Sequence, residues 1–393
     1  MAGRDRAGKR SIFEEVGQGV ASAPPQGGMI AAKARGARRG IRIWLVMLFL
    51  LVATMIAVGG MTRLTDSGLS ITEWRPVTGA IPPMDQATWE AEFEKYRAIP
   101  EYQLQNKGMS LEDFKVIYWW EWGHRQMGRV IGLVWLVGFL GFLVARQIPA
   151  GWTGRLFGLG VLGGVQGAIG WWMVSSGLTG TMLDVASYRL ATHLGLAFVI
   201  LGLIAWYVFL LGRTETELMQ ARRGREAKLF SMSTGLMHFA FLQILLGALV
   251  AGIDAGRAFP TWPLMNGQFF PADAFYVPDG NGGSLPIWHA FFENPGLVQL
   301  MHRMSGYLLF VFAVVVWLRG RRSAHAATRG AFHAVLAMMV AQMGLGIAAV
   351  LTAAHVHVAI THQIGAVILW VLIIRARHMA GYPVAGSIRE GTA

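Results

Sequence analysis

The sequence contains no cysteine among its 393 residues. Disulfide bonds, thiolate catalysis, covalent c-type haem attachment and iron–sulfur clusters on protein thiolates are therefore excluded. Charged residues are also scarce, at 14% of the chain, whereas a soluble protein carries about a quarter. With 54% hydrophobic residues and a mean hydropathy of +0.45, the composition predicts an integral membrane protein.

The net charge of +12 does not indicate nucleic-acid binding. The basic residues gather in short segments between apolar runs, which is how membrane topology is encoded. Residues 1–40 are basic and rich in Gly, Ala and Pro, which predicts a disordered tail on the cytoplasmic side. The first apolar run, from about Ile41, is long enough to span a bilayer, so a cleaved signal peptide is not expected. The tail favours a bacterial inner (plasma) membrane over a mitochondrial inner membrane.

Eight apolar runs are long enough to cross a bilayer, which takes about 20 helical residues. Basic residues concentrate in the tail and in the connections 212–228 and 319–329, whereas the long connections 63–118 and 253–296 are acidic overall. This pattern predicts that both termini lie inside and the two long connections outside. The runs lie at about 42–62, 122–145, 154–175, 188–211, 230–252, 297–318, 331–352 and 357–375.

The chain repeats itself. HRQMG (His124–Gly128) matches HRMSG (His302–Gly306), THLGLAFVILGLI from Thr192 matches THQIGAVILWVLI from Thr361, and GVQGAIGWW from Gly164 resembles AQMGLGIAA from Ala341. These matches predict an all-α membrane protein of two tandem four-helix bundles related by internal duplication. The predicted parts are the tail 1–40, an N-terminal half 41–212, a cytoplasmic linker 213–229, a C-terminal half 230–376 and a cytoplasmic tail 377–393.

Four histidines lie within about two turns of the outer ends of the second, fourth, sixth and eighth spans. They are His124, His193, His302 and His362. Two opposed imidazoles at one depth are what a six-coordinate haem iron requires. Gly128 and Gly306, four residues after a histidine, leave room for a flat macrocycle on the same helix face. The alternative is that the histidines are packing residues hydrogen-bonded between helices.

The two halves differ beside the histidines. Glu121 stands three residues before His124, whereas Gln299, which cannot titrate, stands before His302. A carboxyl group at this depth suits proton transfer, so only the first half would carry an acid–base group. The alternative is a structural ion pair between Glu121 and Arg125, four residues apart on one helix.

Other features allow two interpretations. Arg125, Arg129 and Arg303 either bind haem propionates or extend to the membrane surface. The loops that begin near Gly68 and Ala255 are expected to cover the haem pockets. A helix at Leu111–Phe114, with Ser110 as its N-cap, is expected to continue into the second span. His355 and His357 form either an HxH metal site or, as we favour, part of a solvated loop.

Further motifs resemble a known family. They are EWGHRQMGR (Glu121–Arg129), TGAIPP (Thr78–Pro83), FPTWPLMNGQFFP (Phe259–Pro271), MHRMSGY (Met301–Tyr307) and THQIG (Thr361–Gly365). Over about residues 40–380 the chain resembles haem A synthase, in the branch found in proteobacteria and mitochondria. Other members carry a cysteine pair in outer loops, and the redox role of that pair cannot apply here.

The resemblance implies oxidation of the C8 methyl of haem O to a formyl group by two hydroxylations, through haem I, to give haem A for cytochrome c oxidase. By position, His302 and His362 would ligate a haem b cofactor, His124 and His193 would hold the substrate haem, and Glu121 would be the essential carboxylate. The expected partners are haem O, haem O synthase, oxidase assembly factors and membrane lipid, without nucleic acid, and a homo-oligomer is left open.

Two other functions compete with this interpretation. A two-haem membrane cytochrome b for electron transfer would use all four histidines identically and would not need Glu121. A transporter would also explain repeats and buried polar groups, but the expected Gly/Pro-broken midplane helices are missing from the sequence.

Overall fold

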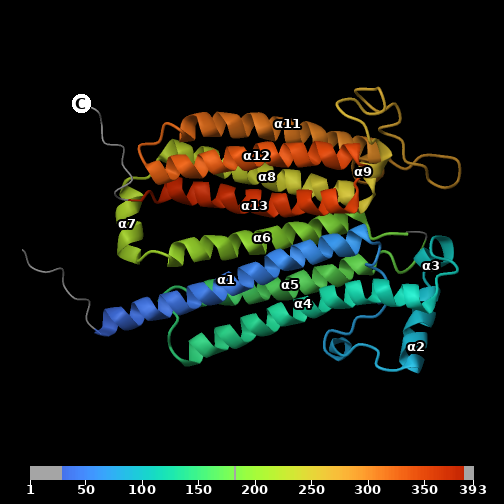
Figure 1. Ribbon diagram of the computed structural model, residues 1–393, viewed down its shortest axis with the longest axis horizontal. Coiled ribbons are helices and arrows are strands. Elements are labelled where there is room, and N and C mark those ends of the chain that lie inside the picture. The colour runs from blue at the N-terminus through green and yellow to red at the C-terminus, as the bar shows by residue number, and fades with distance from the viewer. Residues whose placement is uncertain (1–28, 181–182, 385–393) are drawn as a thin grey trace, which may run out of the picture.

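The long elements of the chain are eight membrane-crossing helices (Figure 1). The computed structural model describes residues 29–180 and 183–384, and this part contains the eight predicted spans. They are α1 (Met29–Leu64), α4 (Leu111–Val144), α5 (Thr153–Val174), α6 (Ser187–Leu211), α8 (Ala227–Gly252), α11 (Pro295–Gly320), α12 (Ala326–Leu351) and α13 (Val356–Gly381). The prediction of an all-α protein with eight spans is therefore confirmed.

The spans form two groups in chain order. Figure 1 shows α1, α4, α5 and α6 together on one side and α8, α11, α12 and α13 on the other. The groups meet where α6 packs against α8 and α13, and where α1 packs against α13. At this interface Trp370 Nε1 donates to the carbonyl oxygen of Phe198 (2.9 Å), and Gln363 Nε2 donates to that of Ile56 (2.7 Å). The grouping follows the predicted halves, and the internal duplication itself stays a prediction.

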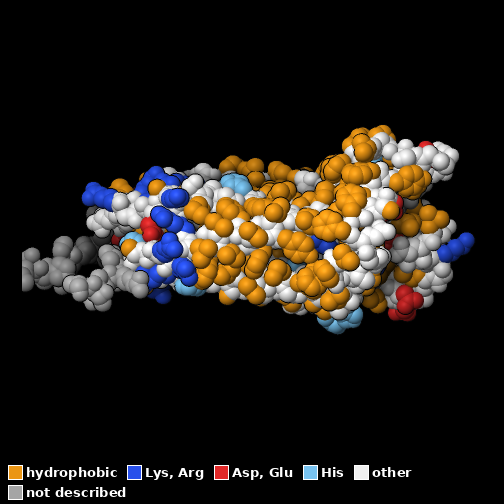
Figure 2. Space-filling model, turned by 90° about the horizontal axis from the view of Figure 1, so that it is seen from above, with side chains coloured by type: hydrophobic (Ala, Val, Ile, Leu, Met, Phe, Trp, Pro, Cys, Tyr) orange, Lys and Arg blue, Asp and Glu red, His pale blue; other side chains and the backbone are white. Residues whose placement is uncertain are grey.

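The short elements lie at the two ends of the bundle. Figure 2 shows that Lys and Arg side chains gather at the end that carries α7, whereas apolar side chains cover the middle. Such a basic end is predicted to face the cytoplasm. The orientation of the termini stays a prediction. The short elements are η1 (Thr78–Ala80), α2 (Gln86–Arg97), α3 (Pro100–Leu104), α7 (Glu215–Arg223), α9 (Ala255–Ala258), η2 (Ile287–His289) and α10 (Ala290–Glu293).

The boundaries of the predicted tails need correction. Helix α1 begins at Met29, so residues 29–40 are helical although they were assigned to a disordered tail. The segment is rich in Ala, Arg and Lys, which are strong helix formers and extend a helix that is already nucleated in the membrane. At the other end, α13 continues to Gly381, past the predicted boundary at residue 377. The remainders of both tails, 1–28 and 385–393, lie outside the described residues.

The first long connection folds into a small cap on the N-terminal end of α4. Ser110 Oγ accepts from the Asp113 amide (3.2 Å) and the Asp113 carboxylate accepts from the Ser110 amide (3.3 Å), which forms a capping box. From there α4 runs without a break into the second span, as predicted. The cap packs through an aromatic cluster of Trp89, Phe93, Tyr96, Phe114 and Tyr118.

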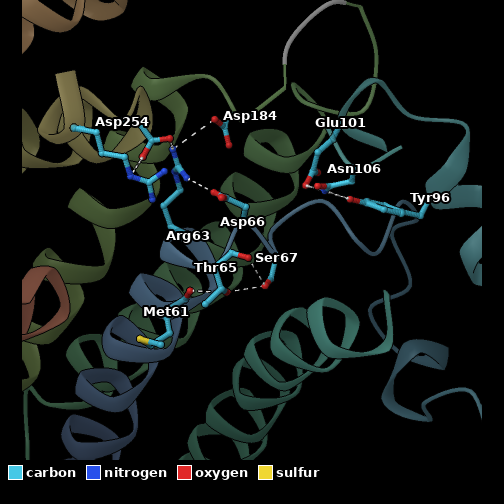
Figure 3. Close-up of polar contacts among 11 residues, drawn as sticks. Met61, Arg63, Thr65, Asp66, Ser67, Tyr96, Glu101, Asn106, Asp184 and Asp254 are labelled. Carbon is cyan, nitrogen blue, oxygen red and sulfur yellow. Dashed lines mark hydrogen bonds and ion pairs between the residues drawn. The ribbon is translucent and has the colours of Figure 1, made fainter. Parts of the chain in front are cut away.

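An ion-pair cluster joins the two halves at the end of the bundle opposite α7 (Figure 1). Arg63, at the end of α1, pairs with Asp66 (2.8 Å), Asp254 (2.9 Å) and Asp184 (3.5 Å) (Figure 3). Asp254 follows α8, so this arginine connects the ends of the first and fifth spans. The arginine side chain is only 12% exposed, and pairs shielded from water are screened less than surface pairs.

A buried acid lies in the cap beside this cluster. The Glu101 carboxylate accepts from the Tyr96 hydroxyl (3.3 Å) and from the Asn106 amide (3.3 Å), and Glu101 is 3% exposed (Figure 3). Burial raises the pKa of Glu101 to about 8; the hydrogen bond from Tyr96 opposes this shift, and the nearby acid Asp184 adds to it.

We predict that Glu101→Gln stabilises the protein only at alkaline pH. The folded chain holds the Glu101 proton with a pKa of about 8 against an ordinary value of 4.5, so the wild-type free energy of unfolding falls as pH rises through this window. The amide keeps the hydrogen bonds and carries no charge. The unfolding temperature in detergent should rise by about 2 °C or more at pH 8.5 and be unchanged at pH 4.5.

The matched control is Glu94→Gln, which changes an exposed acid on α2. It should leave the unfolding temperature unchanged at both pH values. An equal effect of Glu101→Gln at pH 4.5 and pH 8.5 would contradict the prediction.

Candidate functional site

The four predicted histidines lie on four helices, two in each half. Each is half-buried. The pairs are His124 of α4 with His193 of α6, and His302 of α11 with His362 of α13. The structure therefore places two of the histidines in each half, and their pairing on a haem stays a prediction.

Each histidine ring lies against a glycine on the preceding span. A Cβ placed on that glycine would stand 2.8–3.1 Å from the ring Cε1, which is closer than side chains normally approach. Any larger residue would displace the imidazole. The glycine–histidine contacts are Gly59–His124, Gly170–His193, Gly247–His302 and Gly346–His362.

Three of the histidines are also held by a glutamine. The Nε2 atoms of Gln166, Gln243 and Gln342 donate to the main-chain oxygens of His193 (3.0 Å), His302 (3.0 Å) and His362 (2.7 Å), respectively. Each glutamine stands four residues before the glycine that seats the same ring, so both contacts come from one helix face. Sequence reasoning missed these residues, although the repeated spacing Q-x-x-x-G was visible.

This arrangement fits haem better than a bare metal ion. In the described parts of the chain, no three His, Asp or Glu side chains converge as a non-haem metal centre would need. Two imidazoles complete the coordination of an iron whose other four ligands come from a macrocycle. The Nδ1 atoms of His124 and His362 are buried without a hydrogen-bond partner, so these rings are not committed to a protein network.

Glu121 lies one helical turn above His124 and is 3% exposed. Its Oε2 atom accepts from the Ser70 hydroxyl (2.7 Å) and from the Ile71 amide (2.7 Å). Its Oε1 atom pairs with Arg125 (2.5 Å), which also donates to the Ile71 carbonyl (2.7 Å). The structural ion pair that the sequence allowed is therefore formed, and it anchors the loop after α1 to the histidine helix. The acid–base role of Glu121 stays a prediction.

The second half repeats this anchor with a neutral side chain. Gln299 Nε2 donates to the Ala255 carbonyl (2.8 Å), and Arg303 donates to the Gln299 oxygen (2.9 Å) and to the Phe259 carbonyl (2.9 Å). Position 299 corresponds to position 121, and the loop after α8 corresponds to the loop after α1. Both halves thus fasten an outer loop beside a histidine, and only the first half does so with a carboxylate.

The arginines considered for haem propionates bind loop carbonyls. Arg129 donates to the carbonyl oxygens of Pro76 (2.9 Å) and Arg75 (2.9 Å). In Arg303, Nε and Nη1 are buried without a partner, so this guanidinium retains free donors. The rings of His355 and His357 lie 5.4 Å apart on exposed residues, and no third ligand joins them within the described chain.

We predict that Gly346→Val weakens retention of the haem that His302 and His362 are expected to ligate. A side chain at position 346 collides with the His362 ring, and displacing one ligand should weaken haem retention by about tenfold or more. The measurement is the haem-to-protein ratio of the purified variant, from its absorption spectrum.

The matched control is Gly344→Val on the same helix. A Cβ at Gly344 meets nothing within 4 Å, so this variant should keep its haem. Equal haem content in the two variants would show that the glycine contact does not position His362.

Comparisons with known proteins show the family of this chain. The family model described as cytochrome oxidase assembly protein matches residues 42–374. A protein of Ruegeria sp. named "Heme A synthase" is 67% identical over 384 residues, which cover 97% of this chain and 99% of the relative. Proteins of the same name from Roseobacter denitrificans and Cereibacter sphaeroides are 64% and 63% identical over 97% and 98% of this chain and 99% of each relative. The chain therefore belongs to the cytochrome oxidase assembly protein family.

Proposed function

We propose that this protein is a haem A synthase of the bacterial inner membrane. It would oxidise the C8 methyl of haem O to a formyl group by two hydroxylations, through the alcohol haem I, followed by loss of water from the gem-diol. The observation that carries the proposal is the identity of 62–67% over nearly the whole chain with proteins named for this activity. The two histidine pairs provide a place for a substrate haem and a second haem in one chain.

The first half is proposed to bind haem O and the second half a haem b cofactor. His124 and His193 would hold the substrate, and His302 and His362 would ligate haem b. A haem bound by two histidines exchanges single electrons, which is the chemistry that the cofactor would supply. The difference between Glu121 and Gln299 supports this division, because only the first pair has a carboxylate one turn away.

Glu121 is proposed to transfer a proton near the reacting methyl. Its carboxylate is held by Ser70, Ile71 and Arg125, so its position is fixed before substrate binds. A positioned acid–base group contributes about 10²–10⁴-fold to a rate. The same hydrogen bonds hold the outer loop over the site, so the carboxylate would have both a structural and a chemical task. Haem O synthase and oxidase assembly factors are the proposed partners that deliver the substrate and receive the product.

We predict that haem extracted from the purified protein contains both haem b and members of the haem O series. The protein should be produced in cells that also make haem O synthase, and extracts should be analysed by mass spectrometry. Haem b together with haem O, haem I or haem A identifies a haem-modifying enzyme. Haem b alone, at two per chain, would instead establish the two-haem electron-transfer cytochrome that the histidine pattern also allows.

We predict that Glu121→Gln keeps haem b and lowers conversion of haem O by about 100-fold or more. A glutamine at position 121 can still accept from Arg125, as Gln299 accepts from Arg303, but its amide nitrogen cannot accept from the Ile71 amide. The haem b content of the variant therefore reports whether the fold survives the weaker loop anchor. Conversion is measured as the fraction of haem I plus haem A in the extract. Glu112→Gln, which changes a 79% exposed acid on the same helix, is the control and should convert normally. Normal conversion by Glu121→Gln would remove the proposed chemical role.

A further inference from the structure

One of the four histidines is not held as the others are. His193, His302 and His362 each receive a hydrogen bond on the main-chain oxygen from a glutamine of the preceding span. The position four residues before Gly59, where this glutamine would stand for His124, is occupied by Met55. A thioether cannot donate a hydrogen bond. His124 therefore keeps its glycine contact and lacks the hydrogen bond from a glutamine to its main-chain oxygen, which we call the clamp.

Met55 occupies the same space as the glutamines. Its Cε atom lies 3.4 Å from the place where a Cβ on Gly128 would stand. Gln243 Nε2 lies 3.1 Å from the corresponding place on Gly306 in the other half. Gly128 and Gly306 each follow their histidine by four residues, so the two surroundings correspond. The site around position 55 thus has room for a glutamine and holds a methionine.

The clamp affects both the helix and the ring. In two of the three cases the glutamine nitrogen also lies close to the imidazole, 3.2 Å from His193 Nδ1 and 3.1 Å from His302 Nδ1. A side chain bound at once to the main chain and beside the ring restricts how the imidazole turns or withdraws. The Nδ1 atoms of His124 and His362 are both buried with no hydrogen-bond partner, so neither ring has this additional restraint, and the main-chain hydrogen bond alone separates His124 from the other three histidines. Outer-sphere contacts of this kind change metal-site affinity by about 10–100-fold.

We propose that, because position 55 holds a methionine, His124 is the haem ligand that moves away when the substrate haem enters and the product haem leaves. The inference rests on the proposed function, because it requires the first half to exchange its haem. A cofactor is retained, and the pair that would hold it, His302 and His362, has both clamps. The exchanging half keeps the Gln166 clamp on His193 and has lost the one on His124. Met55 is thus a positioning residue that acts through His124.

The test is a reciprocal exchange of the two side chains in the full-length protein. Met55→Gln adds the missing clamp and should raise the amount of haem O, haem I and haem A per haem b in the purified protein by about threefold or more, through slower release. Gln243→Met removes a clamp from His302 and should make haem b dissociate faster when imidazole is added, as followed by absorption. Met55→Leu, which adds no donor, should retain haem as the wild type does.

Each outcome decides between the alternatives. The inference is supported if retention of the haem O series rises in Met55→Gln and not in Met55→Leu. Haem b at the wild-type level shows that each variant is folded. Unchanged retention in Met55→Gln, with the haem O series present, overturns the inference and leaves the proposed function intact. If the wild-type extract contains only haem b, at two per chain, the proposed function itself fails.

Discussion

The contact between a histidine ring and a glycine of the preceding span organises this molecule. An imidazole inside a bilayer needs a defined place, because an unsatisfied polar group in hydrocarbon costs several kcal/mol. The glycine supplies that place without a side chain, and it requires two helices to approach closely at one depth. The same contact pairs α1 with α4, α5 with α6, α8 with α11 and α12 with α13. The arrangement of the bundle and the position of the site thus have one cause.

The outer loops add the difference between the halves. In both, an arginine and its neighbour four residues earlier fasten the loop that follows the first span of that half. Gln299 does this by donating to a carbonyl, whereas Glu121 accepts from an amide and a hydroxyl. The two loops are therefore fastened at the same place through opposite hydrogen-bonding groups, and only Glu121 introduces a negative charge beside a histidine. Similar scaffolds with different chemistry are what the proposed division between substrate and cofactor requires.

Sequence reasoning found the spans, the four histidines and the Glu121 position. Long apolar runs and repeated motifs can be recognised without knowing how each helix is rotated about its axis. It missed the three glutamines, since a polar residue within an apolar run does not reveal its partner until neighbouring helices are placed. It allowed an ion pair between Glu121 and Arg125 but could not supply Ser70 and Ile71, which come from a loop about 50 residues away. The tail boundary was wrong because a basic, alanine-rich segment looks solvated whether or not it is helical.

Helix α1 lies next to residues of both candidate sites, the one in the first half and the one in the second half. Gly59 seats the His124 ring, and the next residue, Gly60, packs against Gln363, which follows His362 in the chain. The same glutamine donates to the Ile56 carbonyl and so joins α13 to α1. The segment Gly59–Gly60 therefore touches both halves: a side chain added there reaches His124 directly, or reaches Gln363, the neighbour of His362.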